Sequence, residues 1–284
     1  MSQSVDPTTT AEPLTETPHE QRLVEEASAM PSRLLFETIR QSGEEELSRP
    51  NVALWFSGIA AGILISFSVL GEALLRSHLP DAEWAYIIEN FGYSLGFVLV
   101  ILGRMQLFTE NTITTVVPVL INPCDNLYKR TAELWGIVLL ANVVGAFIAG
   151  GFLQVAPVLS DEVATAVAEL SAHATGMGMI EGFARGIPAG VLIAALVWMM
   201  PMARGGELWL ILLITWLIAL GDFTHIIAGS VEMAYAMLGG DLGPLRAVFW
   251  FFLPVLLGNV VGGTVVFTML AWAQTRAEVA KPAD

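Results

Sequence analysis

The chain has 284 residues, of which 55% are hydrophobic and only 14% charged, and its formal net charge is −14. Soluble domains carry about a quarter charged residues, so this composition excludes an ordinary soluble fold. The acidic balance also excludes nucleic acid as a partner, because no basic surface is present to neutralise phosphates. The charges gather at the two ends of the chain, which predicts solvated tails on a lipid-soluble body.

Residues 1–50 are predicted to form an acidic N-terminal tail, which holds ten acids and four arginines. The first 20 residues are rich in Thr, Pro, Glu and Ser, and they lack the basic start and apolar core of a cleaved signal peptide. Apolar residues mixed with charged ones over 31–47 predict an amphipathic helix that lies on the membrane surface or beneath the protein body. A helix that is simply solvated is an equal alternative.

Residues 51–275 are predicted to form an all-α transmembrane domain, followed by a short tail at 276–284. An α-helix needs about 20 residues to cross the hydrocarbon. Six spans meet this requirement: 53–75, 87–120, 133–155, 177–200, 208–238 and 248–273. The second and fifth are too long for one crossing and carry polar residues near their centres, so we expect broken helices there. Unwound backbone is tolerated in a membrane only where protein buries it or where it lines a wet cavity.

Six crossings place both termini on the same side of the membrane, and the distribution of Lys and Arg indicates which side. If both ends are cytoplasmic, the inner loops and tails hold nine basic residues, whereas the outer loops hold only Arg76 and Arg246. The long outer loop at 156–176 holds none. Basic residues are enriched on the cytoplasmic side, so both termini are predicted to be cytoplasmic.

Three short strings recur in the same order along the chain. The string GIAAG at 58–62 returns as GIPAG at 186–190, Phe108-Thr109 returns as Phe223-Thr224, and NVVG at 142–145 returns at 259–262. Three crossings in each half would make the halves two inverted repeats. Inverted repeats with matching broken helices indicate a solute path near the bilayer midplane. Small residues also recur because membrane helices pack through them, but that alternative does not explain the paired polar breaks.

Ionisable groups inside a membrane are costly and are therefore candidates for function. The fifth span carries Asp222, Thr224 and His225 at its break. Because histidine changes its proton occupancy near neutral pH, we expect His225 to donate a hydrogen bond to an anion on a pore or to lend it a proton. The alternative is a structural histidine bonded to Asp222 or to a freed carbonyl. Glu89 is a further candidate for function. Three other ionisable groups in the spans fit boundary anchors or ion pairs as well as functional residues: Arg104, Arg185 and Glu232.

The break in the second span carries Thr109, Glu110 and Asn111. The Thr109 hydroxyl is expected to contact a solute, whereas Glu110 and Asn111 contact the solute or cap the broken ends. The helix that follows each break presents a positive dipole end, which favours an anion nearby. Tyr93 and Phe97 lie one turn apart before this break, so they form an apolar constriction or pack in the core.

The order and spacing of these strings resemble the formate/nitrite transporter family over about residues 30–273. The strings in the first half are YSLGF at 93–97, LFT at 107–109, LW at 134–135 and NVVG at 142–145. Those in the second half are RGI at 185–187, LVW at 196–198, FTH at 223–225 and GNVVGG at 258–263. No single string is decisive, but their order is specific.

The resemblance implies an aquaporin-like subunit of six helices with its own pore, assembled as a homopentamer in the bacterial inner membrane. It implies passage of small monovalent anions such as formate, nitrite or hydrosulfide. His225 matches the family's central pore histidine, and Thr109 matches the threonine of the broken second helix. Tyr93 and Phe97 match the cytoplasmic-side constriction, and Ile218 falls where the aromatic residue of the other constriction usually stands.

The sequence also departs from the family's pattern. Thr224 stands where glutamate usually precedes the histidine, Gly190 replaces a pore asparagine, and Ala174 stands near a usual lysine. Glu110 and Asp222 add negative charge near the breaks. These departures reduce the number of groups that would attract an anion, and they indicate a divergent branch of the family.

Three alternatives remain open at this point. The same fold would serve a small neutral solute, or the protein would be a sensor or scaffold that binds a partner through its acidic tail. An enzyme is the weakest alternative: the Gly-x-Ser-x-Gly pattern around Ser94, with His225 as its base, lacks the strand–turn–helix context of that motif. No cofactor and no metal are expected, because the histidines lie in separate segments without paired ligand spacing and no phosphate-binding loop is present.

Overall fold

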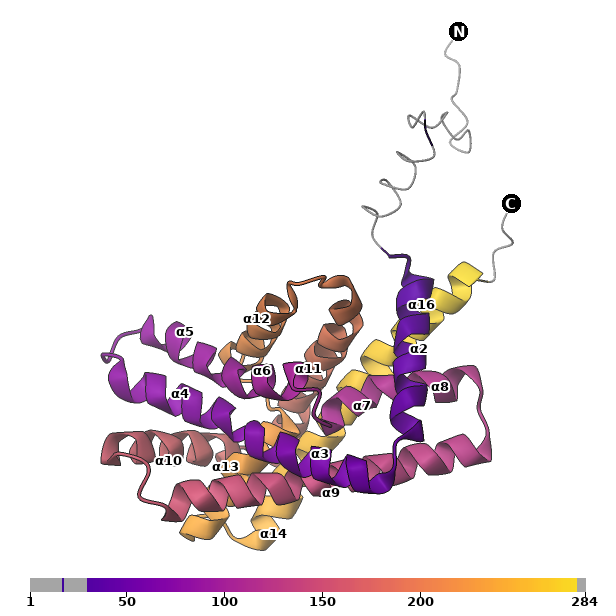
Figure 1. Cartoon of the computed structure of the whole chain (residues 1–284). Helices are drawn as coiled ribbons and strands as arrows, with labels where there is room; N and C mark the ends of the chain where they lie inside the picture. Colours follow the sequence, from indigo (N-terminus) through magenta and orange to yellow (C-terminus); the bar gives the residue numbers. More distant parts are fainter. Residues whose placement is uncertain (1–16, 18–29, 280–284) are drawn as a thin grey trace. The chain divides into compact units, whose positions relative to one another are not determined.

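The computed structural model describes residue 17 and residues 30–279, with side chains up to residue 277. Contacts divide the chain into two units, Met1–Pro31 and Ser32–Asp284, and the fold described below is that of the second unit. Its described residues are helical, with short connections (Figure 1).

The helices of the first half begin with α2 and end with α9. They are α2 Ser32–Ser48, α3 Asn51–Leu64, α4 Ser66–His78, α5 Ala85–Glu89, the 3-10 helix η1 Asn90–Tyr93, α6 Ser94–Leu102, α7 Phe108–Thr114, α8 Val116–Ile121 and α9 Asp125–Val155.

The second half begins with α10, which follows α9. Its helices are α10 Asp161–Gly176, α11 Met179–Met199, the 3-10 helix η2 Met200–Met202, α12 Glu207–Leu220, α13 Ile226–Gly239, α14 Pro244–Arg246, the π-helix η3 Ala247–Phe252, α15 Leu253–Val260, the π-helix η4 Val261–Thr268 and α16 Met269–Val279.

Among the described residues, five helical stretches are long and apolar enough to cross a membrane: Asn51–His78, Ala85–Leu102, Asp125–Val155, Met179–Met202 and Pro244–Ala277. Three shorter apolar stretches, Phe108–Ile121, Glu207–Leu220 and Ile226–Gly239, lie between them. The predicted fifth span therefore corresponds to two shorter helices, α12 and α13. The predicted second span corresponds to α5–α6 followed by α7–α8.

Helix α10 fills most of the segment 156–176, which was predicted only as a loop. Ser160 caps its N-terminus, because its hydroxyl accepts a hydrogen bond from the Val163 amide at 3.4 Å. Val163, Val167 and Leu170 recur at helical spacing and are buried. This periodicity is the signal of an amphipathic helix, but the segment is too polar to appear as a span.

Helix α2 is packed into the compact unit through one apolar face. Phe36 and Ile39 are buried in a cluster with Ile113, Val117 and Ala194, which belong to α7, α8 and α11. On the same helix, a Cβ at residue 43 would collide with the carbonyl of residue 114, so a glycine is needed for this close approach. The amphipathic pattern over 31–47 therefore marks a helix that packs against the spanning helices.

Two close helix crossings rest on glycines. A Cβ on Gly62 of α3 would collide with the carbonyl of Asn142 in α9, and a Cβ on Gly190 of α11 would collide with the carbonyl of Asn259 in α15. Small residues let helix backbones approach one another inside membranes. The strings GIAAG and GIPAG therefore have the packing role that the alternative interpretation of the repeat gave them.

The first helix break is held by Asn142, which is fully buried in α9. Its Oδ1 accepts a hydrogen bond from the amide of Phe108, the first residue of α7, at 2.9 Å. Its Nδ2 donates to the carbonyls of Gly58 and Gln106, both at 2.8 Å. One side chain thus satisfies backbone groups on both sides of the gap and joins them to α3.

Asn259 does the same at the second break, and it is also fully buried. Its Oδ1 accepts from the amide of Ile226, the first residue of α13, at 2.9 Å. Its Nδ2 donates to the carbonyls of Gly186 and Thr224, both at 2.9 Å. An unsatisfied backbone group costs several kcal/mol inside a membrane, so these two amides are what make the gaps tolerable.

The hydrogen bonds correct the register of one predicted match. Phe108 and Ile226 each begin a helix and each donate to the equivalent asparagine. Phe223 lies three residues before α13, so the match of Phe108-Thr109 with Phe223-Thr224 is out of register by three positions. In the correct register His225 corresponds to Leu107, and the histidine has no counterpart in the first half.

We expect Gly62→Ala to destabilise the protein by about 1–3 kcal/mol, because the added methyl group forces α3 and α9 apart. Gly136→Ala is the matched control, since a Cβ there meets no atom within 4 Å and alanine favours the helix. Thermal unfolding of both variants in detergent measures the difference. Equal midpoints for the two variants would contradict the packing role of Gly62.

We expect Asn259→Ala to lower stability by at least about 2 kcal/mol, because three buried backbone groups lose their partner at once. Asn122→Ala is the control, since Asn122 is exposed at the end of α8. The readouts are the yield of folded protein and its thermal midpoint. If Asn259→Ala matched the control, the second break would not depend on this amide.

Candidate functional site

His225 is the residue that precedes α13, and only 1% of its surface is exposed. Its Nδ1 accepts a hydrogen bond from the amide of Ala228 at 3.3 Å, which caps the helix N-terminus. Because Nδ1 acts as an acceptor, the neutral ring carries its proton on Nε2. The fold therefore fixes both the orientation and the tautomer of this histidine.

Thr109 lies opposite His225 in the first turn of α7, and the distance between its Oγ1 and His225 Nε2 is 2.6 Å. With the proton on Nε2, the imidazole donates and the threonine oxygen accepts, which leaves the threonine hydroxyl hydrogen as a donor. The Phe97 ring packs edge-on against the imidazole with centroids 4.9 Å apart, and Tyr93 follows it at 5.4 Å. The predicted residues Thr109, His225, Phe97 and Tyr93 thus form one contiguous row.

A cavity of about 330 Å³ reaches His225 from one side, and we call it the α10 cavity. Its lining combines side chains of α4, η1, α10, α13 and the second break. Those that matter for its charge are Glu72, Arg76, Tyr93, His173, Asp222 and Glu232.

Carboxylates outnumber guanidinium groups around the α10 cavity. Arg76 is paired with Glu89 at 2.7 Å and lies 4.0 Å from Glu72. Glu232 makes no hydrogen bond or ion pair with the residues that the structure describes, and the Tyr93 hydroxyl likewise has no such partner. The lining of this cavity therefore holds more acidic than basic side chains, and it includes two unpartnered polar groups.

Asp222 closes the second break from the same side. It has a left-handed backbone conformation with φ 53°, and its carboxylate bonds to Arg185 of α11 and to His173 of α10, the latter at 3.0 Å. Glu181 pairs with the same arginine at 2.8 Å. Asp222 therefore anchors the break to α10 and α11. Arg185 has the role of an ion-pair partner, and Asp222 is not bonded to His225.

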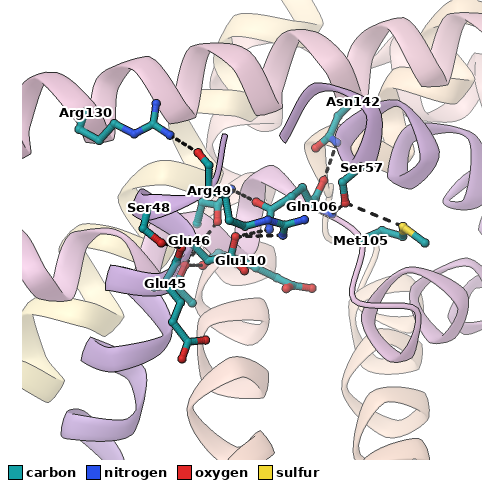
Figure 2. A network of polar contacts seen from close by, with 12 residues as sticks. Glu45, Glu46, Ser48, Arg49, Ser57, Met105, Gln106, Glu110, Arg130 and Asn142 are labelled. Atoms are coloured by element: carbon teal, nitrogen blue, oxygen red, sulfur yellow. Dashed lines mark hydrogen bonds and ion pairs between the residues drawn. The ribbon is translucent and has the colours of Figure 1, made fainter. Parts of the chain in front are cut away.

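A groove of about 520 Å³ lies on the side of α2, and we call it the α2 groove. Figure 2 shows its centre, where Gln106 of the first break lies close to Glu46 of α2. The backbone amide of Gln106 donates to Ser57 Oγ at 3.0 Å. The side chain of Gln106 bonds to Glu46 and, at 3.4 Å, to Asn111. Glu46 also pairs with Arg49 at 3.2 Å.

Glu110 lines this groove next to Thr109, and its Oε1 is buried without a hydrogen-bond partner in the described structure. Asn111 is 3% exposed and joins the Gln106 side chain to Thr114. The two residues therefore have different roles: Asn111 holds the break together, whereas Glu110 presents a carboxyl group to the groove.

The remaining predicted site residues have mainly structural contacts. Thr224 lines the α10 cavity, and its carbonyl accepts from Asn259. Ile218 is fully buried, and its carbonyl accepts from the Phe223 amide at 2.9 Å. Arg104 is exposed with φ 52° at the first break.

Two expectations about the sides of the membrane conflict with each other. The family resemblance places the constriction at Tyr93 and Phe97 on the cytoplasmic side, whereas the loop charges place Arg76 outside. Tyr93 and Arg76 line the same cavity, so both statements cannot hold. With cytoplasmic termini, the aromatic pair faces the outside.

Four residues at the site have roles that were not predicted from the sequence: Gln106, Asn142, Asn259 and Glu72. The recurring NVVG string was the available signal for the two asparagines, since a polar residue repeated in an apolar span needs a buried partner. Gln106 and Glu72 carry no such signal, because their importance comes from contacts with distant parts of the chain.

Comparison with known proteins places this geometry in a family. The family model described as "Formate/nitrite transporter" matches residues 33–273. The chain is 40% identical over 252 residues to the Escherichia coli inner membrane protein YfdC, covering 88% of this chain and 81% of that protein.

Two solved structures have the same fold. One, described as an FNT family ion channel, matches with a TM-score of 0.73 at 16% identity and covers 86% of this chain and 98% of that one. The other, a pentameric formate channel with formate bound, matches with a TM-score of 0.67 at 22% identity and covers 79% and 97%. The chain therefore belongs to the formate/nitrite transporter family.

Proposed function

We propose that this protein is a membrane channel or transporter that passes a small monovalent anion of the formate or nitrite type, or its conjugate acid. The observation that carries the proposal is the Thr109–His225 hydrogen bond. The α10 cavity ends at His225, and the α2 groove ends at Glu110, which adjoins Thr109. The pair thus lies between two depressions that open on different helices.

The proposed path passes through two inverted three-helix repeats, each with a broken second helix. The equivalent bonds of Asn142 and Asn259 support this arrangement, because each asparagine joins the break to the first spanning helix of its own half, α3 or α11. We place both termini in the cytoplasm of a bacterial cell, which puts the α2 groove inside. Five subunits are proposed on the precedent of the pentameric formate channel.

The Thr109–His225 pair suits a small anion or weak acid in transit. A solute that enters between them meets two hydrogen-bond donors, the Nε2–H of the histidine and the threonine hydroxyl. The N-terminus of α13 lies directly behind the histidine, and its positive dipole end favours negative charge. The surrounding rings exclude water, which strengthens these interactions.

The acidic lining of the α10 cavity favours entry of the conjugate acid over the free anion. The carboxyl groups of Glu72 and Glu232 give an anion no positive partner and repel it wherever they are ionised, whereas a neutral acid is not repelled. His225 and Thr109 then act on a solute that arrives with its proton. This expectation distinguishes the protein from a channel whose mouth concentrates anions.

We expect His225→Ala and Thr109→Val each to reduce flux of labelled formate by at least about tenfold, because each removes one of two donors from a water-poor site. Proteoliposomes containing the purified full chain and an internal pH indicator measure the flux over a range of external pH. His78→Ala is the matched control, since His78 is exposed at the end of α4.

The pH series separates the possible outcomes for the histidine. A flux that followed only the undissociated acid at every pH, and that was the same in His225→Ala, would exclude the role of His225. A uniform loss in His78→Ala as well would indicate damaged protein, which thermal unfolding of each variant checks independently.

We expect Glu232→Gln to increase flux of the ionised solute at alkaline pH, where the Glu232 carboxyl ionises, and to change it little at pH 7, because a partly buried carboxyl without a partner stays protonated. Glu83→Gln is the control, since Glu83 is exposed in the loop before α5 and does not line the α10 cavity. The same liposome assay applies. If both variants changed flux equally, the effect would come from net charge and not from the cavity.

A further inference from the structure

A third depression lies away from the proposed path, between α2, α8 and α16, and we call it the α16 groove. It encloses about 600 Å³ and is lined by eight residues: Arg33, Phe36, Glu37, Leu120, Ile121, Trp272, Thr275 and Arg276. Figure 1 shows α2 and α16 side by side at the end of the unit where α8 also lies. None of the residues proposed for transport lines it.

The two arginines of the groove have no acidic partner among the described residues. Arg33 makes no hydrogen bond or ion pair there, and Arg276 only stacks over the Trp272 ring at 5.2 Å. Both side chains are exposed. They thus present two unneutralised guanidinium groups, which are suited to bind the oxygens of a phosphate.

Glu37, the one acid among the described residues that line the groove, is already neutralised. Glu37 bonds to Arg40 through both carboxylate oxygens at 2.7 Å and to Gln41 at 2.9 Å. The hydrogen bonds from Arg40 and Gln41 lower the pKa of Glu37 to about 2, so it stays a partner of Arg40, which also bonds to Glu44. The positive charge of Arg33 and Arg276 is therefore not cancelled inside the groove.

The α8 side of the groove, which we call its lower wall, is apolar because Leu120 and Ile121 line it. Ile121 at the end of α8 is 47% exposed, and Leu270 of α16 is 67% exposed. Leu270 lies six residues before Arg276, which corresponds to about 9 Å along a helix. Trp272 lies between Leu270 and Arg276 in the sequence of α16, and tryptophan is typical of the boundary between hydrocarbon and headgroups.

We propose that the α16 groove is a binding site for an anionic phospholipid, with the phosphate on Arg33 and Arg276 and an acyl chain along Ile121 and Leu120. Basic pockets between spanning helices bind such headgroups. A free phosphate would use only the upper half of the groove, so the apolar lower wall selects a lipid. The bound phospholipid contacts both α2 and α16 and belongs to the surrounding leaflet.

The test uses the delipidated full chain returned to phosphatidylcholine vesicles with or without about a quarter phosphatidylglycerol. Native mass spectrometry counts the phosphatidylglycerol retained per chain. We expect the double variant R33Q/R276Q to weaken retention by about thirtyfold, from about fivefold per arginine. R246Q is the matched control, because Arg246 is exposed near α14 and does not line the groove.

Each other outcome overturns the proposal in a distinct way. Equal retention by the wild type and R33Q/R276Q would exclude the groove as the site. Equal loss in R246Q would indicate diffuse attraction to net charge. Displacement of the lipid by inorganic phosphate would show an anion site without lipid selectivity, and a change of oligomeric state in R33Q/R276Q with retention unchanged would assign the groove to subunit contacts.

Discussion

The structure depends on the need to satisfy backbone hydrogen bonds at two interruptions inside an apolar body. Each interruption leaves amides and carbonyls without helical partners, and no bulk water is available to bind them. Asn142 and Asn259 supply one acceptor and two donor bonds each, in the same pattern. Without these two amides, His225 and Thr109 would not be held at hydrogen-bonding distance.

The glycine crossings and the asparagines act together. Gly58 and Gly186 offer the carbonyls that the asparagines bind, and neighbouring glycines let the helices come close enough for those bonds to form. A larger residue at either crossing would move the asparagine away from its break. The close packing of these helices is therefore a condition for the geometry at the breaks.

Much of the fold could be predicted from the sequence, because long apolar spans and polar interruptions are strong local signals. Contacts between distant residues could not. The Phe-Thr match was wrong by three residues, since two identical residues in an apolar chain do not fix a register. The helix α10 was missed because hydropathy does not detect a polar helix. The row of Thr109, His225, Phe97 and Tyr93 combines residues that were predicted one by one, whereas the acidic mouth around Glu232 follows only from the assembled helices.

The position of α2 has a consequence for the order of assembly. Its apolar face packs against Ile113 and Val117 in the first half, against Ala194 in the second, and beside α16 at the end of the chain. A ribosome makes α2 before any of these partners, and folding during synthesis proceeds from the N-terminus. The earliest of these helices to emerge is thus among the last to reach its final contacts. Until then Phe36 and its neighbours remain exposed to chaperones and proteases.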